Sequence, residues 1–168
     1  MFRQAVPIER LRYIAELQDL LPQALFIHIV RRPEAVIASR LDAAGRYEAW
    51  SQASSVEENL RIWNIAIRIS ANYIRDPRHL IVRYESLIEK TDEIMSAINR
   101  FIGIDDVPLE LLLSRRIATT RSVILPEEKW KQKNLGPIEP CDKSGALLTE
   151  NELNYIKINS VSIPNSAL

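Results

Sequence analysis

Apolar residues recur at helical spacing near the start of the chain. Pro7 suits the first position of a helix, and the apolar positions that follow it are Ile8, Leu11, Ile14, Leu17 and Leu21. Intervals of three or four residues place such side chains on one face of a helix. Because Pro22 cannot continue a helix, we expect an amphipathic helix that ends before it.

The next two apolar segments flank a pair of arginines. Residues 25–30, LFIHIV, are too few for a helix and largely apolar on both faces, which is typical of a central parallel strand covered on both sides. Arg31 and Arg32 follow, and Pro33 suits the start of a second helix. The predicted buried face of this helix comprises Val36, Ile37, Leu41 and Ala44. We expect Gly45 to end the helix in the left-handed conformation.

A long helical stripe precedes a second strand. Residues 55–58, SVEE, fit a capping box, and the apolar stripe after them comprises Val56, Leu60, Trp63, Ile67, Ala71 and Ile74. Residues 79–84, HLIVRY, form the second predicted strand. Helical segments between two strands favour a parallel, right-handed crossover. The predicted fold class is therefore α/β, with a short parallel sheet flanked by helices.

The last part of the chain contains two further helical patterns separated by a long irregular segment. Thr91 is predicted to cap a helix that ends at Gly103, with Ile94, Ile98, Phe101 and Ile102 buried. A short helix is expected over residues 108–113. Thr149 is predicted to cap the last helix, and the final residues look like an unpacked tail.

Length and charge limit the class of protein. The chain has 168 residues, 46% of them hydrophobic, so it can bury its apolar surface as one domain. We divide residues 1–168 into a core of residues 7–113, an irregular basic loop of residues 114–147, and a C-terminal helix and tail of residues 148–168. Lysine and arginine number 22, as do aspartate and glutamate, which excludes a uniform positive field for nucleic acid or a membrane surface. Without a signal pattern or a long apolar run, the sequence predicts a cytoplasmic protein.

Cysteine and histidine usage predicts neither a disulfide nor a metal site. Cys141 is the one cysteine, and we expect an incidental or buried thiol there. His28 lies in the middle of the first predicted strand, where a hydrogen-bonded interior histidine is expected. His79 is the one other histidine, so the sequence offers too few ligands at suitable spacing for a metal ion.

The paired arginines stand where an anion site commonly forms. In an open parallel sheet, ligands bind beyond the carboxyl ends of the strands, where helix N-termini present N–H groups and partial positive charge. A guanidinium group matches phosphate oxygens, and a serine two turns into the next helix can add a hydroxyl donor. Arg31 and Ser39 therefore form a candidate phosphate clamp. The alternative is that both arginines pair with surface carboxylates and Ser39 is a small helix residue.

The same stretch resembles a known family. IVRRPEAVIASR, residues 29–40, is similar to the sulfotransferase segment, usually V-R-x-P-x-x-x-x-x-S, that holds the 3′-phosphate of 3′-phosphoadenosine 5′-phosphosulfate (PAPS). The arginine and serine are eight residues apart in both. Further ordered landmarks are LPQALFIHIVRRP, the long helix with Trp63 and Asn64, and HLIVRYESLIEKTDEIMSAINRFIGI, which resembles the family's strand, Tyr-Glu-x-Leu, helix and glycine ending.

This resemblance implies a fold and a set of cofactor contacts. The implied fold is the three-layer, P-loop-NTPase-like sulfotransferase fold, and the implied roles are Arg31 and Ser39 on the 3′-phosphate and Tyr84 beside the adenine. Trp130 and Lys131 resemble the Trp-Lys/Arg pair of the family's cofactor-covering loop, without the glycine that commonly precedes it. No metal is implied.

One family feature has no counterpart in this sequence. Full-length sulfotransferases begin with a strand and a loop like P-K-S-G-T-T-W, whose amides cradle the 5′-phosphosulfate. The glycines here are Gly45, Gly103, Gly136 and Gly145, which do not cluster, and no catalytic residue is assigned. Glu9 is an acid in a first helical turn, where it more commonly complements the helix dipole than serves as a base. We expect an incomplete sulfotransferase domain with an exposed sheet edge, which a homodimer could cover.

The implied reaction is sulfuryl transfer from PAPS to a hydroxyl or amine acceptor, leaving 3′,5′-adenosine bisphosphate. We expect this chain to carry the 3′-phosphate-binding half of such a site and to have little or no activity alone. Two alternatives are a non-catalytic nucleotide-binding module and an α/β protein-interaction domain without a nucleotide site.

Overall fold

The computed structural model describes residues 13–46, 55–105, 142–165 and 167–168. The chain divides into two compact units, Met1–Tyr84 with Asp142–Leu168, and Glu85–Cys141. The short helix expected over residues 108–113 and most of the expected loop lie outside the described residues. Each unit is described by itself.

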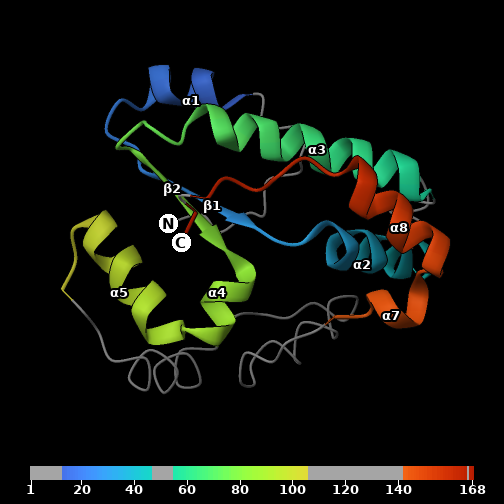
Figure 1. Ribbon diagram of the computed structural model, residues 1–168. Helices are drawn as coiled ribbons and strands as arrows, with labels where there is room; N and C mark the ends of the chain where they lie inside the picture. The colour runs from blue at the N-terminus through green and yellow to red at the C-terminus, as the bar shows by residue number, and fades with distance from the viewer. Residues whose placement is uncertain (1–12, 47–54, 106–141, 166) are drawn as a thin grey trace. The chain divides into compact units, whose positions relative to one another are not determined.

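A two-stranded parallel sheet organises the first unit, and its described elements are α1 (Ile14–Leu20), β1 (Phe26–Val30), α2 (Pro33–Arg46), α3 (Val56–Asn72), β2 (His79–Arg83), α7 (Ser144–Leu147) and α8 (Glu150–Asn159) (Figure 1). The strands pair from Phe26 with His79 to Val30 with Arg83. The predicted parallel pairing is confirmed. The described part is a mixed α/β structure with a short parallel sheet and helices.

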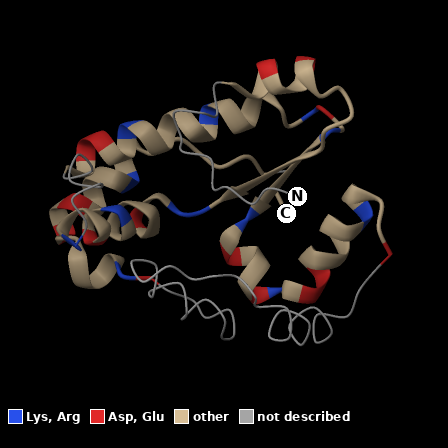
Figure 2. Ribbon diagram, turned by 180° about the vertical axis from the view of Figure 1, so that it is seen from behind, with Lys and Arg blue, Asp and Glu red and all other residues tan. Residues whose placement is uncertain are grey.

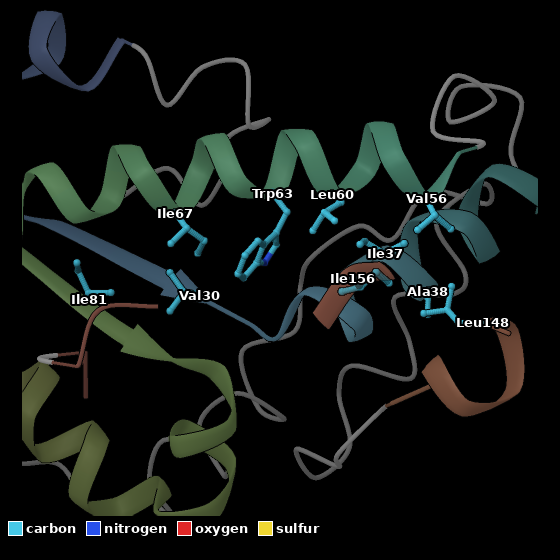
Figure 3. Close-up of a cluster of buried hydrophobic side chains, with 10 residues drawn as sticks. All are labelled: Val30, Ile37, Ala38, Val56, Leu60, Trp63, Ile67, Ile81, Leu148 and Ile156. Atoms are coloured by element: carbon cyan, nitrogen blue, oxygen red, sulfur yellow. The ribbon is translucent and has the colours of Figure 1, made fainter. Parts of the chain in front are cut away.

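The core lies where α3 crosses the sheet. The long stripe predicted for α3 is confirmed over its first four positions, because Val56, Leu60, Trp63 and Ile67 are all buried. These side chains meet Val30 and Ile81 of the sheet, Ile37 and Ala38 of α2, and Leu148 and Ile156 of the C-terminal segment (Figure 3). Segments distant in the sequence thus share one core.

The first strand is covered on one face, which corrects the expectation of cover on both. His28 and Val30 are buried on the side of α3, whereas Ile27 and Ile29 are 40% and 60% exposed. An apolar strand pattern shows which positions favour burial but not whether another element covers them. Within the described residues, β1 has β2 as its sheet neighbour.

Helix ends agree with the predictions in part. Gly45 is helical within α2, so its predicted cap is wrong, and an ion pair between Asp42 and Arg46 supports the added turn. Ser55 caps α3, but the box is incomplete because Glu58 pairs with Arg61. Thr149 forms the full capping box of α8.

The C-terminal tail is packed, contrary to the prediction. The amide of Leu168 donates to the carbonyl of Ile81 at 2.9 Å, and the amide of Arg83 donates to the carbonyl of Leu168. Val161, Ile163 and Ala167 pack against the core. The tail therefore occupies the edge of β2 that faces away from β1, a long-range pairing that composition does not reveal.

The second unit begins at the second residue of helix α4, which covers Tyr84–Glu89, and continues with α5, which covers Thr91–Ile102. Gly103 ends α5 with a φ of 74°, as predicted, while Lys90 rather than Thr91 is the N-cap. Tyr84, predicted to end the strand, instead begins α4.

A chain of hydrogen bonds crosses the buried face of the sheet and confirms the expected interior role of His28. Its Nδ1 lies 3.0 Å from Ser70 Oγ and its Nε2 lies 2.8 Å from His79 Nδ1. His79 Nε2 in turn lies 2.9 Å from Gln18 Nε2, which also donates to Asp76 at 3.0 Å. Because the amide nitrogen can only donate, His79 must accept at Nε2 and donate at Nδ1, and His28 must do the same. The network assigns both histidines as neutral.

Packing reinforces this assignment. The His79 ring stacks on Tyr73 at 4.3 Å and on Phe26 at 4.7 Å between ring centroids. Burial, and then the neighbouring His79, lower the pKa of His28 to about 4, and burial also lowers the pKa of His79. The Arg78 guanidinium holds the pKa of Asp76 at about 2, so this carboxylate keeps its charge where histidines titrate.

We predict that the free energy of unfolding falls as pH drops from 6.5 to 4. The unfolded chain binds protons at its histidines in this window while the folded chain does not, so acid favours unfolding. For His28 the contribution is at most about 3 kcal/mol. Urea unfolding of the wild type and of His28→Gln across this range measures it, and the variant should show the smaller slope.

The chain has two histidines, so the His28→Gln, His79→Gln double variant is the control. It should lose the histidine component of the slope altogether. Equal slopes for the wild type and the double variant would contradict the neutral network.

Candidate nucleotide-binding site

Two arginines occupy the turn from the carboxyl end of β1 into α2. In Figure 2 the ribbon is blue, the colour of Lys and Arg, in the segment that joins the two elements. The carbonyl of Arg32 accepts the first intrahelical bond of α2, from the amide of Val36 at 3.2 Å. By helix geometry, the amides of Glu34 and Ala35 then have no acceptor within the helix. Guanidinium groups and the positive end of a helix dipole therefore meet at this place.

The position of Arg31 is defined by two aromatic residues. Trp63 of α3 donates from its indole nitrogen to the carbonyl oxygen of Arg31 at 2.9 Å. The guanidinium carbon of Arg31 lies 4.6 Å from the ring centroid of Tyr84, within the range of a cation–π interaction. The structure thus brings together two of the sequence-predicted site residues, Arg31 and Tyr84, at the carboxyl ends of both strands.

Ser39 lies further along α2. It is exposed and stands six residues beyond Pro33, about 9 Å along the helix axis. The helical repeat puts Ser39 on the same face of α2 as Asp42, three residues after it. Its convergence with Arg31 on a single phosphate group stays a prediction.

Arg32 has carboxylate partners. Its Nη2 lies 2.8 Å from Asp142 Oδ2, and its Nε lies 3.7 Å from Glu34 Oε1. Pairing with surface carboxylates, the alternative considered for both arginines, is therefore observed for Arg32. Arg31 lies near the same Asp142 carboxylate and favours its charged form.

Asp142 is a part of this region that the sequence does not reveal. It lies 110 residues after Arg32 and just before α7, in a segment without a recognisable motif. The pKa of Asp142 lies below its usual range, first because the Ser144 backbone amide donates to it and further because Arg32 and Arg31 are close. Lys143 pairs with Asp42 of α2 and lowers the pKa of that carboxyl. The segment before α7 is thus attached to α2.

Other predicted positions are not described. Glu9, Trp130, Lys131 and Cys141 lie outside the described residues. Among the residues that are described, no group of three or more His, Cys, Asp or Glu side chains could hold a metal ion. Within that same part of the chain, every helix is too short or too polar to cross a membrane.

Comparisons with known proteins give one match. The search of the curated proteins and the search of the solved structures found no match. The family model described as the sulfotransferase family matches residues 8–108, which is more than half of the 168 residues and includes both strands and the arginine turn. The chain belongs to the sulfotransferase family.

Proposed function

We propose that this chain binds the 3′-phosphate of PAPS at the carboxyl end of β1 and serves sulfuryl transfer to a hydroxyl or amine acceptor. Family membership supports the reaction class. The observation that carries the site is the placement of Arg31, which directly follows β1 and whose guanidinium group lies over the ring of Tyr84, the residue that directly follows β2.

The local chemistry suits a phosphate monoester. An arginine fork can donate two hydrogen bonds to phosphate oxygens, and the amides of the first turn of α2 can donate further ones. Pro33 and Ser39 are about 9 Å apart along the helix axis. A phosphate group bound near Pro33 would span part of this distance, so the Ser39 hydroxyl can donate to it from the second turn of the helix. Arg31 would supply charge and Ser39 a neutral donor.

Tyr84 and the two loop residues have proposed roles toward the nucleotide base. An aromatic ring has two faces, so Tyr84 can hold Arg31 on one and lie beside the adenine with the other or with its edge. Trp130 and Lys131 are proposed to cover the bound cofactor, as their likeness to the family's covering loop implies.

The transfer itself needs alignment and charge stabilisation more than a covalent nucleophile. The sulfur–oxygen bond to the donor phosphate breaks as a bond to the acceptor oxygen or nitrogen forms, and the acceptor loses a proton. The glycines of this sequence do not cluster into a phosphate-cradling loop. We therefore assign the chain the 3′-phosphate half of the site and assign no catalytic residue.

A second candidate function follows from the exposed face of β1. Ile27 and Ile29 present apolar surface of the kind that protein partners cover. A protein-interaction domain, including a homodimer across this face, is the corresponding proposal. It predicts that 3′,5′-adenosine bisphosphate does not stabilise the protein.

The binding test is a thermal-shift titration with 3′,5′-adenosine bisphosphate. At a hundred times its dissociation constant, a ligand specific to the folded state adds about 2.7 kcal/mol to stability. We expect this increment for the wild type and its loss in Arg31→Ala, each measured against the same variant without ligand. Arg61→Ala, which alters an exposed arginine of α3 paired with Glu58, should keep the increment. No stabilisation of the wild type would reject the nucleotide site.

The role of Tyr84 is tested by replacing its ring. Tyr84→Leu removes the surface on which the Arg31 guanidinium rests, and we expect the affinity for 3′,5′-adenosine bisphosphate to weaken about three- to tenfold. Tyr84→Phe keeps the ring and should bind within about twofold of the wild type. Isothermal titration calorimetry gives the constants. A leucine variant that binds as well as the wild type would refute the positioning role.

A further inference from the structure

The Asp142 carboxylate is held in place at both of its oxygens. Oδ2 accepts from Arg32 Nη2 at 2.8 Å, and Oδ1 accepts from the backbone amide of Ser144 at 2.9 Å. An acid with a different donor on each oxygen has little freedom to turn away. The negative charge therefore has a defined place beside the arginine turn.

The segment that begins with Asp142 is anchored to α2 by residues that follow it. Lys143, the next residue, pairs with Asp42 of α2. Leu148 is 6% exposed and belongs to the same core cluster as Ile37 and Ala38 (Figure 3). The contact between Asp142 and Arg32 is thus supported by packing within one compact unit.

The arginine turn is partly neutralised by its own chain. Both Arg31 and Arg32 favour the charged form of Asp142, so this side chain is ionised at neutral pH. Glu34 adds a second carboxylate near Arg32, at 3.7 Å. A phosphate monoester, with a charge between −1 and −2 at neutral pH, would approach the same guanidinium groups. It would have to share them with these carboxylates or displace one.

We propose that Asp142 is an intramolecular competitor of the nucleotide phosphate and sets the affinity of the arginine turn for its ligand. This inference rests on the proposed function. In the ion pair between Arg32 and Asp142, the Arg32 side chain is 53% exposed, and ion pairs this exposed are weak. A phosphate can therefore displace the carboxylate, so Asp142 lowers the affinity without closing the site.

The test removes the charge of Asp142 and keeps its shape. Asp142→Asn retains an oxygen for the Ser144 amide but no longer repels a phosphate. We expect 3′,5′-adenosine bisphosphate to bind about three- to tenfold more tightly than to the wild type in calorimetry at low salt. The gain should shrink at high salt, where screening weakens the repulsion.

Two controls separate a local effect from a general one. Glu58→Gln makes the same change in net charge and also frees an arginine, Arg61, at a different place on the surface, so it should bind as the wild type does. Adenosine 5′-monophosphate lacks the 3′-phosphate, and its binding should not respond to Asp142→Asn. Asp142→Ser, which also offers an oxygen to the Ser144 amide, serves as a second variant should the asparagine variant fold poorly.

The measured affinities distinguish failure of the competitor role from failure of the proposed function. A wild type that binds the bisphosphate while Asp142→Asn binds equally or less tightly would overturn the competitor role and leave the proposed function standing. An equal gain in Glu58→Gln, or an equal gain for adenosine 5′-monophosphate, would overturn it too. Absence of binding in every variant would reject the proposed function and this inference with it.

Discussion

The hydrogen bond from the indole of Trp63 to the carbonyl of Arg31 connects the core to the proposed site. Trp63 is 4% exposed, so its N–H needs an acceptor, and leaving such a donor without one costs roughly 1–3 kcal/mol. The indole is fixed by packing against the sheet and α2. The acceptor belongs to Arg31, which directly follows the last residue of β1. The packing that stabilises the core therefore also fixes the backbone from which the Arg31 side chain extends.

Three arginines at the carboxyl ends of the strands have three kinds of partner. Tyr84 holds Arg31 through an uncharged ring, carboxylates hold Arg32, and Arg83 donates to the tail carbonyls of Ile163 and Pro164. A ring orients a guanidinium group without cancelling its charge, whereas a carboxylate cancels much of it. The Asp142 carboxylate lies near Arg31 as well as Arg32, so a phosphate at either guanidinium group would meet the same negative charge.

Local patterns predicted the elements that carry the site, and long-range contacts decided what the sequence could not. The short strand through His28, the stripe through Trp63 and the cap at Thr149 each depend on nearby residues, and all three were predicted, whereas the one-sided cover of the strand was not. Gly45 was misjudged because a glycine inside a helix costs only about 1 kcal/mol, which neighbouring contacts can offset. The pairing of Leu168 with β2 and of Asp142 with Arg32 joins residues more than 80 positions apart, and no periodicity encodes it.

The buried histidine network is neutral, whereas the carboxyl ends of the strands carry arginine side chains. The Gln18 amide sets the tautomers of both histidines, and Asp76 holds this amide in place by accepting a hydrogen bond from it. Asp76 keeps its charge because Arg78 donates to it. The result is a buried chain of neutral donors and acceptors at the start of β2 and the middle of β1. No compensating charge is therefore required on the buried face there. At the carboxyl ends of the strands, Arg31, Arg32 and Arg83 carry charges that water or an anionic ligand can solvate.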